Sequence, residues 1–135
     1  MRWNRPMVEA VCLCGAVRIT TPFAPSEVKA CNCGACRRLG TLWAYYNPAQ
    51  VKISGTTVGF QRHDMGEPAM LAFHHCPICG CTTHWADLDR SRDRMGVNAR
   101  LMTPQVMSGA KVAAFDGAET WTVMDDPPTL ARFLK

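Results

Sequence analysis

Long hydrophobic runs are missing from this sequence, since no apolar stretch approaches the ~20 residues of a membrane-spanning helix. The segment that precedes the first cysteine contains no apolar core long enough for a signal peptide. Charge is also sparse: charged residues make up 19% of the chain, and fifteen Lys and Arg against eleven Asp and Glu leave a net charge of +4. Such a charge is too small for a dedicated nucleic-acid binder. We therefore expect a cytoplasmic protein that binds neither a membrane nor nucleic acid.

Disorder and division into several domains also lack support. Hydrophobic residues make up 47% of the chain, which is too apolar for a disordered polypeptide. The sequence contains no linker, internal repeat or low-complexity stretch. Residues 1–135 are expected to form a single domain.

Helical periodicity is scarce as well. Short runs rich in β-branched and aromatic residues recur at intervals typical of an all-β domain. The expected strands are Val11–Thr20, Glu27–Ala30, Leu42–Tyr46, Val51–Gly55, Val58–Arg62, Ala69–His74 and Thr82–Trp85. Only the segment after Asp126 is expected to be helical, because Asp126 can cap a helix and Leu130, Phe133 and Leu134 would share one face. Residues 89–96 are expected to form a solvated charged turn. The pattern predicts a mainly β fold of short antiparallel strands with little helix.

The eight cysteines are the most informative residues, because they are clustered. They occur as Cys12 and Cys14, as Cys31, Cys33 and Cys36, and as Cys76, Cys79 and Cys81. Cysteines one or two residues apart are poorly placed to form a disulfide. Two thiolates that leave one tight turn can instead both reach a zinc ion at about 2.3 Å. The clusters therefore predict metal binding in a reducing compartment.

The run Cys76-Pro77-Ile78-Cys79-Gly80 is typical of a zinc knuckle. Pro77 fixes φ inside the turn, and Gly80 can adopt a positive φ that turns backbone N–H groups toward the sulfurs. A closed structural site needs four ligands, and Cys12 and Cys14 fit as the second pair. The alternative, that some of these cysteines are merely small buried residues, suits an isolated cysteine better than a paired one.

The cluster of Cys31, Cys33 and Cys36 offers three thiolates and no fourth ligand from its own segment. Three protein ligands with one open position are typical of a catalytic zinc. Three thiolates on a divalent cation leave a net charge near −1, which suits the binding of a further thiolate from a substrate. Arg37 and Arg38 could offset that charge and attract an anionic substrate, or they could form a solvated basic pair on a turn.

Three segments together resemble the glutathione-dependent formaldehyde-activating enzyme (GFA) family, which includes the centromere protein V type. They are Cys12-Leu-Cys14-Gly15-Ala16-Val17-Arg18, Cys31-Asn-Cys33-Gly34-Ala35-Cys36-Arg37-Arg38-Leu39-Gly40 and His75-Cys76-Pro77-Ile78-Cys79-Gly80. The resemblance implies a β-tent fold, a structural zinc on Cys12, Cys14, Cys76 and Cys79, and a catalytic zinc on Cys31, Cys33 and Cys36. It also implies a carbon–sulfur lyase that acts on a small-molecule thiol adduct, such as S-(hydroxymethyl)glutathione. Gly34 and Cys81 depart from the family, and Cys81 could compete for metal or act as a redox partner.

Candidates for proton transfer are weak. His74 and His75 precede the knuckle, but a histidine in such a place is more often a packing residue than a base. His63 and His84 are weaker candidates for proton transfer still. The tryptophans Trp3, Trp43, Trp85 and Trp121 are expected to be core or rim residues, and Glu67, Asp87 and Asp89 lack the paired spacing of acid–base carboxylates.

Two other functions stay open. A zinc-stapled binding module could use an arginine group for nucleic acid or another anionic partner, although aspartates alternate with those arginines. The group is Arg37, Arg38, Arg90, Arg92, Arg94 and Arg100. A chain whose second site holds no metal could instead act through redox-active thiols at Cys31, Cys33 and Cys36.

Overall fold

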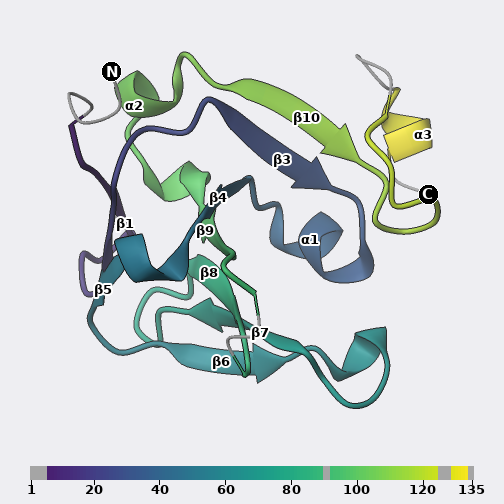
Figure 1. Cartoon of the computed structure of the whole chain (residues 1–135), viewed down its shortest axis with the longest axis horizontal. Helices are drawn as coiled ribbons and strands as arrows, with labels where there is room; N and C mark the ends of the chain where they lie inside the picture. Colours follow the sequence, from purple (N-terminus) through teal and green to yellow (C-terminus); the bar gives the residue numbers. More distant parts are fainter. Residues whose placement is uncertain (1–5, 90–91, 125–128, 134–135) are drawn as a thin grey trace.

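The larger of two β-sheets forms the body of the molecule. The structure, a computed structural model, describes residues 6–89, 92–124 and 129–133. Within these residues seven strands pair in the order β10-β3-β4-β9-β8-β7-β6. Their bounds are β3 (Glu27–Cys31), β4 (Trp43–Tyr46), β6 (Val58–Gln61), β7 (Leu71–His75), β8 (Thr82–Asp87), β9 (Met95–Asn98) and β10 (Lys111–Phe115). The pairs are antiparallel except for β10 and β3, which run parallel and side by side (Figure 1).

The smaller sheet joins the start of the chain to its middle. It pairs β1 (Val8–Val11) with β2 (Arg18–Thr21) and β2 with β5 (Lys52–Ser54), both antiparallel. The turn between β1 and β2 carries Cys12 and Cys14. Figure 1 shows β1 and β5 at the edge of the molecule away from α1.

Helices are short. They are α1 (Gly34–Leu39), α2 (Pro104–Met107) and α3 (Leu130–Phe133), with 3-10 turns η2 (Pro48–Gln50), η3 (His63–Met65) and η4 (Ala99–Leu101). Helix α1 begins where the Cys33 sulfur accepts a hydrogen bond from the Cys36 N–H, and it ends at Gly40 in the left-handed conformation (φ 67°). Among the described residues no helix combines the length and apolarity needed to span a bilayer.

The buried residues form two clusters. One lies between the sheets and includes Val17, Ile19, Tyr46 and Val97. The second is smaller and contains the side chains of Cys33, Cys36, Trp43, Phe73 and Trp85. Burial of apolar surface stabilises both clusters. In the second cluster Cys33 and Cys36 pack against aromatic rings.

The predicted fold class is confirmed: the chain is mainly β with little helix. Each predicted strand lies on an observed one, but the run Val11–Thr20 is interrupted by the first cysteine turn. The prediction that only the C-terminal segment is helical was wrong, because α1 and α2 also form. These helices span too few residues to show helical periodicity, and hydrogen bonds from their capping residues stabilise them instead. Of the predicted charged turn at 89–96, residues 90–91 lie outside the described residues, and Met95 and Gly96 already belong to β9. Asp126 also lies outside the described residues.

Candidate metal centres and an aromatic cavity

Two turns of the same build hold the first group of cysteines. In one turn Cys12 N–H donates to the Val17 carbonyl (3.1 Å), and in the other Cys76 N–H donates to the Cys81 carbonyl (2.9 Å). Gly15 (φ 82°) and Gly80 (φ 81°) provide the left-handed residue of each turn. Backbone N–H groups then reach the sulfurs, from Val17 to Cys12 (3.2 Å) and from Ile78 to Cys76 (3.4 Å). The turn at Cys76 is the knuckle that the sequence predicts, and the turn at Cys12 carries the second predicted ligand pair.

The four sulfurs of Cys12, Cys14, Cys76 and Cys79 lie within 4.8 Å of one another. Two of the separations are 3.7 Å, between Cys12 and Cys14, and 3.6 Å, between Cys14 and Cys76. Tetrahedral coordination with Zn–S distances of about 2.3 Å places sulfurs about 3.8 Å apart. A backbone hydrogen bond from Cys81 also lowers the pKa of Cys79 to about 5. The donor set therefore fits a closed thiolate site for a zinc ion.

Cys81 lies beside this group but outside it. Its position in the second turn matches that of Val17 in the first, because each residue closes its turn through its carbonyl. The set of four cysteine sulfurs that could share a metal excludes it. Within the described chain Cys81 is therefore a turn residue next to the site, not one of its ligand set.

The sulfurs of Cys31, Cys33 and Cys36 form a second group and also lie within 4.8 Å of one another. Cys31 ends β3, Cys33 caps α1, and Cys36 lies in the first turn of that helix. The Cys33 N–H donates to the Cys31 sulfur (3.4 Å), and the Cys36 N–H donates to the Cys33 sulfur (3.3 Å). The strand end and the helix start thus gather three sulfurs, which we call the cysteine triad.

Two further side chains donate to the triad. The indole N–H of Trp43 lies 3.2 Å from the Cys36 sulfur, and the Arg62 guanidinium lies 3.9 Å from the Cys33 sulfur. Hydrogen bonding within the triad, first from Cys31, lowers the pKa of Cys33, and the Arg62 charge adds to this. The same hydrogen bonding, again first from Cys31, raises the pKa of Cys36. The triad therefore favours at least one thiolate, and buried donors stabilise it.

The three cysteines of the triad line a cavity of about 370 Å³. The rest of the wall is aromatic, apolar or cationic: it consists of Lys29, Trp43, Tyr45, Arg62, Met65, Leu71, Phe73, Trp85, Arg92, Arg94, Phe115 and Trp121. Among the described residues no carboxylate and no histidine lines it. The cavity therefore suits a ligand that carries sulfur and negative charge.

Each cation of the cavity lies over an aromatic ring. Arg62 is 4.7 Å from the Phe73 ring centroid and Arg92 is 5.4 Å from that of Trp85. Arg94 and Lys29 lie 3.9 Å and 5.0 Å from the centroid of Tyr45. Attraction between cations and ring faces holds these side chains in the wall of the cavity.

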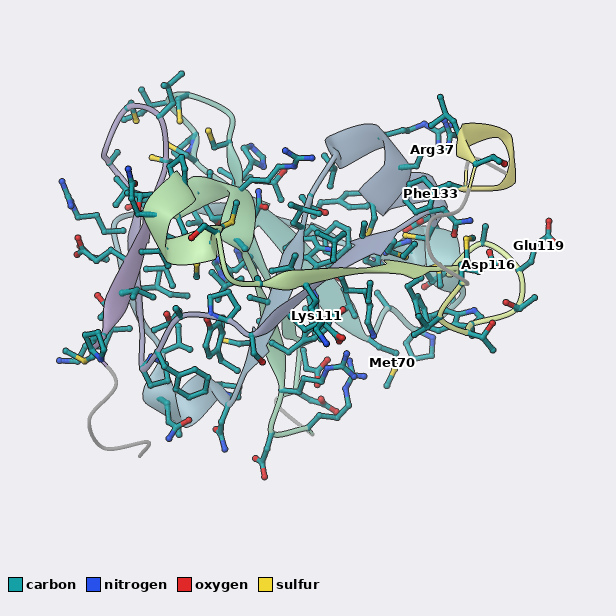
Figure 2. All side chains as sticks on the ribbon, turned by 90° about the horizontal axis from the view of Figure 1, so that it is seen from above. Arg37, Met70, Lys111, Asp116, Glu119 and Phe133 are labelled. Atoms are coloured by element: carbon teal, nitrogen blue, oxygen red, sulfur yellow. The ribbon has the colours of Figure 1, made fainter. Side chains whose placement is uncertain are left out.

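A loop after β10 covers the triad. Its first residue, Asp116, accepts a hydrogen bond from the buried Asn32 amide (3.1 Å), and the Asn32 carbonyl oxygen accepts one from the Ala118 N–H (2.9 Å). Figure 2 shows Asp116 and Glu119 in this loop, at the same end of the molecule as Arg37 on α1 and Phe133 on α3. Trp121, in the left-handed conformation (φ 57°), ends the loop and lines the cavity.

Arg37 and Arg38 do not line this cavity, which favours the alternative of a solvated basic pair over a role in attracting substrate. Both are exposed on α1, and Arg38 donates to the Gly34 carbonyl (2.9 Å). Arg62 takes the charge-balancing role instead. Arg62 has no local signal in the sequence, because its contact with Cys33 spans 29 residues. Lys29 was missed although it lies two residues before Cys31 on a strand, a spacing that places both side chains on one face.

None of the four histidines lines the triad cavity. His74 stacks on His84 with ring centroids 4.4 Å apart, and both line a different cavity. Burial lowers the pKa of both, that of His84 to about 4. The interpretation of His74 as a packing residue is therefore supported. Of the described tryptophans, Trp43 and Trp85 are buried and Trp121 is exposed, and all three line the triad cavity; Trp3 lies outside the described residues.

The arginines that suggested an anionic partner do not form one surface. Arg92 forms an ion pair with the buried Asp87 (2.6 Å), Arg94 lies over Tyr45, and Arg100 donates to the Gly40 carbonyl (2.6 Å). Arg90 lies outside the described residues. Because most of these side chains are engaged locally, the described part of the group does not resemble a nucleic-acid interface.

Comparisons with known proteins agree with the fold. A family model described as "Glutathione-dependent formaldehyde-activating enzyme" matches residues 7–121. A search of curated proteins found no match. Among solved structures, the chain is similar to a crystal structure of a Rhodobacter sphaeroides protein that was a structural genomics target. The two are 21% identical with a TM-score of 0.60, and the match covers 77% of this chain and 98% of that one. Such a likeness shows a shared fold alone.

Proposed function

The chain belongs to the glutathione-dependent formaldehyde-activating enzyme family, and from that premise we propose that it is a zinc-dependent carbon–sulfur lyase acting on glutathione adducts. In the forming direction the glutathione sulfur bonds to the aldehyde carbon, and the thiol proton ends on the former carbonyl oxygen. In the cleaving direction the same carbon–sulfur bond breaks and aldehyde is released. The product of formation from formaldehyde is S-(hydroxymethyl)glutathione.

The observation that carries this proposal is the cavity at the cysteine triad. Glutathione has two carboxylates and one ammonium group, so its net charge at neutral pH is negative. The cavity wall offers four cations, Lys29, Arg62, Arg92 and Arg94, and no carboxylate among the described residues. A negatively charged thiol therefore suits both the sulfurs of the cysteine triad and the cationic side chains of the cavity.

We assign a structural zinc to Cys12, Cys14, Cys76 and Cys79 and a catalytic zinc to Cys31, Cys33 and Cys36. Zinc at the triad would lower the pKa of a bound thiol and so favour its nucleophilic form. Arg62 and Trp43 stabilise the negative charge of the sulfurs through their N–H groups.

We also propose that the Tyr45 hydroxyl stabilises the aldehyde oxygen by a hydrogen bond, without giving up its proton. Burial raises the pKa of Tyr45 to about 12, so the phenol is protonated at neutral pH. A protonated phenol in the cavity wall can donate a hydrogen bond to the aldehyde oxygen as negative charge develops there. We propose that the chain forms one GFA-type zinc-binding domain and that it performs this chemistry in a reducing compartment such as the cytosol.

The test begins with zinc per chain, measured by elemental analysis on protein purified under reducing conditions without chelator. We expect two zinc ions. Exchange NMR at equilibrium then measures how fast formaldehyde and glutathione interconvert with S-(hydroxymethyl)glutathione. We expect the protein to raise this rate, Cys36→Ser to abolish the increase and Cys81→Ser to retain it.

An unchanged exchange rate with fully loaded protein would overturn the lyase proposal. One zinc per chain with about four reactive thiols would favour the redox alternative, in which the triad cysteines act without metal.

A further inference from the structure

The four cations of the triad cavity differ in how their charge is balanced. Arg62 forms a bidentate ion pair with Asp64 (2.9 and 2.7 Å), and Arg92 forms one with Asp87 (2.9 and 2.6 Å). Among the described residues no carboxylate forms an ion pair with Lys29 or Arg94. Two of the four positive charges are thus left for a ligand.

Lys29 and Arg94 reach the cavity from strands on either side of Tyr45. Lys29 lies on β3, Arg94 directly precedes β9, and β4 with Tyr45 lies between these strands. Both cations contact the Tyr45 ring, and Lys29 also lies 4.4 Å from the Phe115 ring centroid. Tyr45 therefore holds two like charges in one part of the cavity wall.

This arrangement is unfavourable while no anion is bound. Lys29 and Arg94 carry like charges and both lie against the Tyr45 ring. Fixed cations that repel each other and face a cavity are poised to bind an anion.

We propose that Lys29 and Arg94 form a carboxylate-binding subsite that holds the C-terminal carboxylate of a thiol peptide whose sulfur lies at the cysteine triad. The identity of the thiol rests on the proposed function. The anion-binding property itself rests only on the placement of the two cations. Planar guanidinium and compact ammonium groups both form charge-assisted hydrogen bonds with a carboxylate.

The spacing of the two subsites bears on the choice of thiol. Lys29 and Cys31 are two residues apart on β3, so their α-carbons are about 7 Å apart and their side chains share a face. In free cysteine only three bonds separate the sulfur from the carboxylate carbon. In a peptide in which glycine follows cysteine, six bonds separate them. The spacing favours a carboxylate on the residue after the cysteine, as in glutathione, over one on the cysteine itself.

The test measures binding of S-methylglutathione, whose blocked thiol separates anion recognition from sulfur chemistry. Isothermal titration calorimetry compares this ligand with its glycine ethyl ester on the zinc-loaded protein. We expect the ester to bind about tenfold to a hundredfold more weakly, as for the loss of a charged hydrogen bond. Arg94→Gln and Lys29→Gln should weaken binding of the acid by a similar factor and leave binding of the ester unchanged. Arg94→Lys should restore part of the loss.

Arg37→Gln is the matched control, because Arg37 is an exposed arginine that does not line the cavity. It should bind both ligands as the wild type does. Thermal melting checks that each Gln variant remains folded. Three results would each overturn the subsite. The acid and the ester could bind equally well, the variants could weaken the binding of both ligands equally, or the acid could fail to bind. A subsite that binds the acid without any effect on formaldehyde exchange would overturn the lyase proposal alone.

Discussion

Gly117 lies directly against the sulfur of Cys31. A Cβ built on Gly117 would be 2.5 Å from that sulfur and 3.3 Å from the Cβ of Cys33. Gly117 belongs to the loop that Asn32 and Asp116 fasten to the end of β3. No side chain can occupy the space between this loop and the triad, so the approach requires glycine.

Gly117→Ala should therefore weaken metal binding at the triad. The added methyl group must move either the loop or the Cys31 sulfur, and small displacements around metal ligands cost about tenfold to a hundredfold in affinity. Competition with a chromophoric chelator measures this affinity. Gly109→Ala is the control, because a Cβ on Gly109 meets nothing within 4 Å. The same metal affinity in both variants would contradict the close approach.

Trp43→Phe should lower metal affinity at the triad by about tenfold. The substitution removes the indole N–H that lies 3.2 Å from the Cys36 sulfur. A phenyl ring at this position can still pack on Phe73, whose ring centroid lies 5.4 Å away, so the melting temperature should fall only slightly. Trp85→Phe, in the same cavity, should keep the affinity, since its indole makes no hydrogen bond to a cysteine sulfur within the described chain. Equal losses in both variants would indicate a packing effect alone.

The cysteine groups could be predicted from the sequence because their geometry is local. Two cysteines in one turn that ends in glycine direct their sulfurs to the same point, independently of the rest of the chain. Cys31, Cys33 and Cys36 are close because they lie at the end of one strand and the start of the helix that follows it. The pairing of Cys12 and Cys14 with Cys76 and Cys79 followed from the ligand count of a closed site. Strand positions could be predicted for the same reason, since alternation and turn residues are local signals.

The cavity wall could not be predicted in this way. Arg62 meets Cys33 only because β6 ends beside the buried aromatic cluster, and Arg94 meets Tyr45 only because β4 pairs with β9. Such contacts depend on strand order, which local patterns do not specify. Helix α1 was missed because its capping residue, Cys33, also belongs to a metal-binding pattern, and six residues are too few to show a period.

Substitutions at the two cysteine groups should have unequal effects on stability. Cys79→Ser should unfold or aggregate the chain, because metal binding at a structural site also contributes folding free energy. That site joins the turn after β1 to the turn after β7. Cys36→Ser should leave the protein folded and release one metal ion. Thermal melting with elemental analysis measures both effects, with Cys81→Ser as the control that keeps both metals. Equal damage by Cys79→Ser and Cys36→Ser would remove the distinction between the sites.

His84 should make the protein less stable in mild acid. Its side chain is 4% exposed and stacks on His74, and burial lowers its pKa from 6.5 to about 4. The unfolded chain therefore binds a proton between pH 6.5 and 4 that the folded chain excludes. Stability from the neutral ring is complete above pH 6.5 and is lost as the pH falls toward 4. The loss by pH 5 is about 2 kcal/mol.

Urea unfolding of the wild type and of His84→Gln, at pH 7 and pH 5 with zinc present, isolates this contribution. Glutamine does not titrate, so the difference in unfolding free energy between the two proteins should shrink by about 2 kcal/mol over this range. Acid also weakens zinc binding by the cysteines, but it does so in both proteins and cancels in the difference. The difference in unfolding free energy between the wild type and His84→Gln could instead stay constant from pH 7 to pH 5. The buried ring would then titrate near its ordinary pKa, and the His74–His84 stack would accommodate a charge.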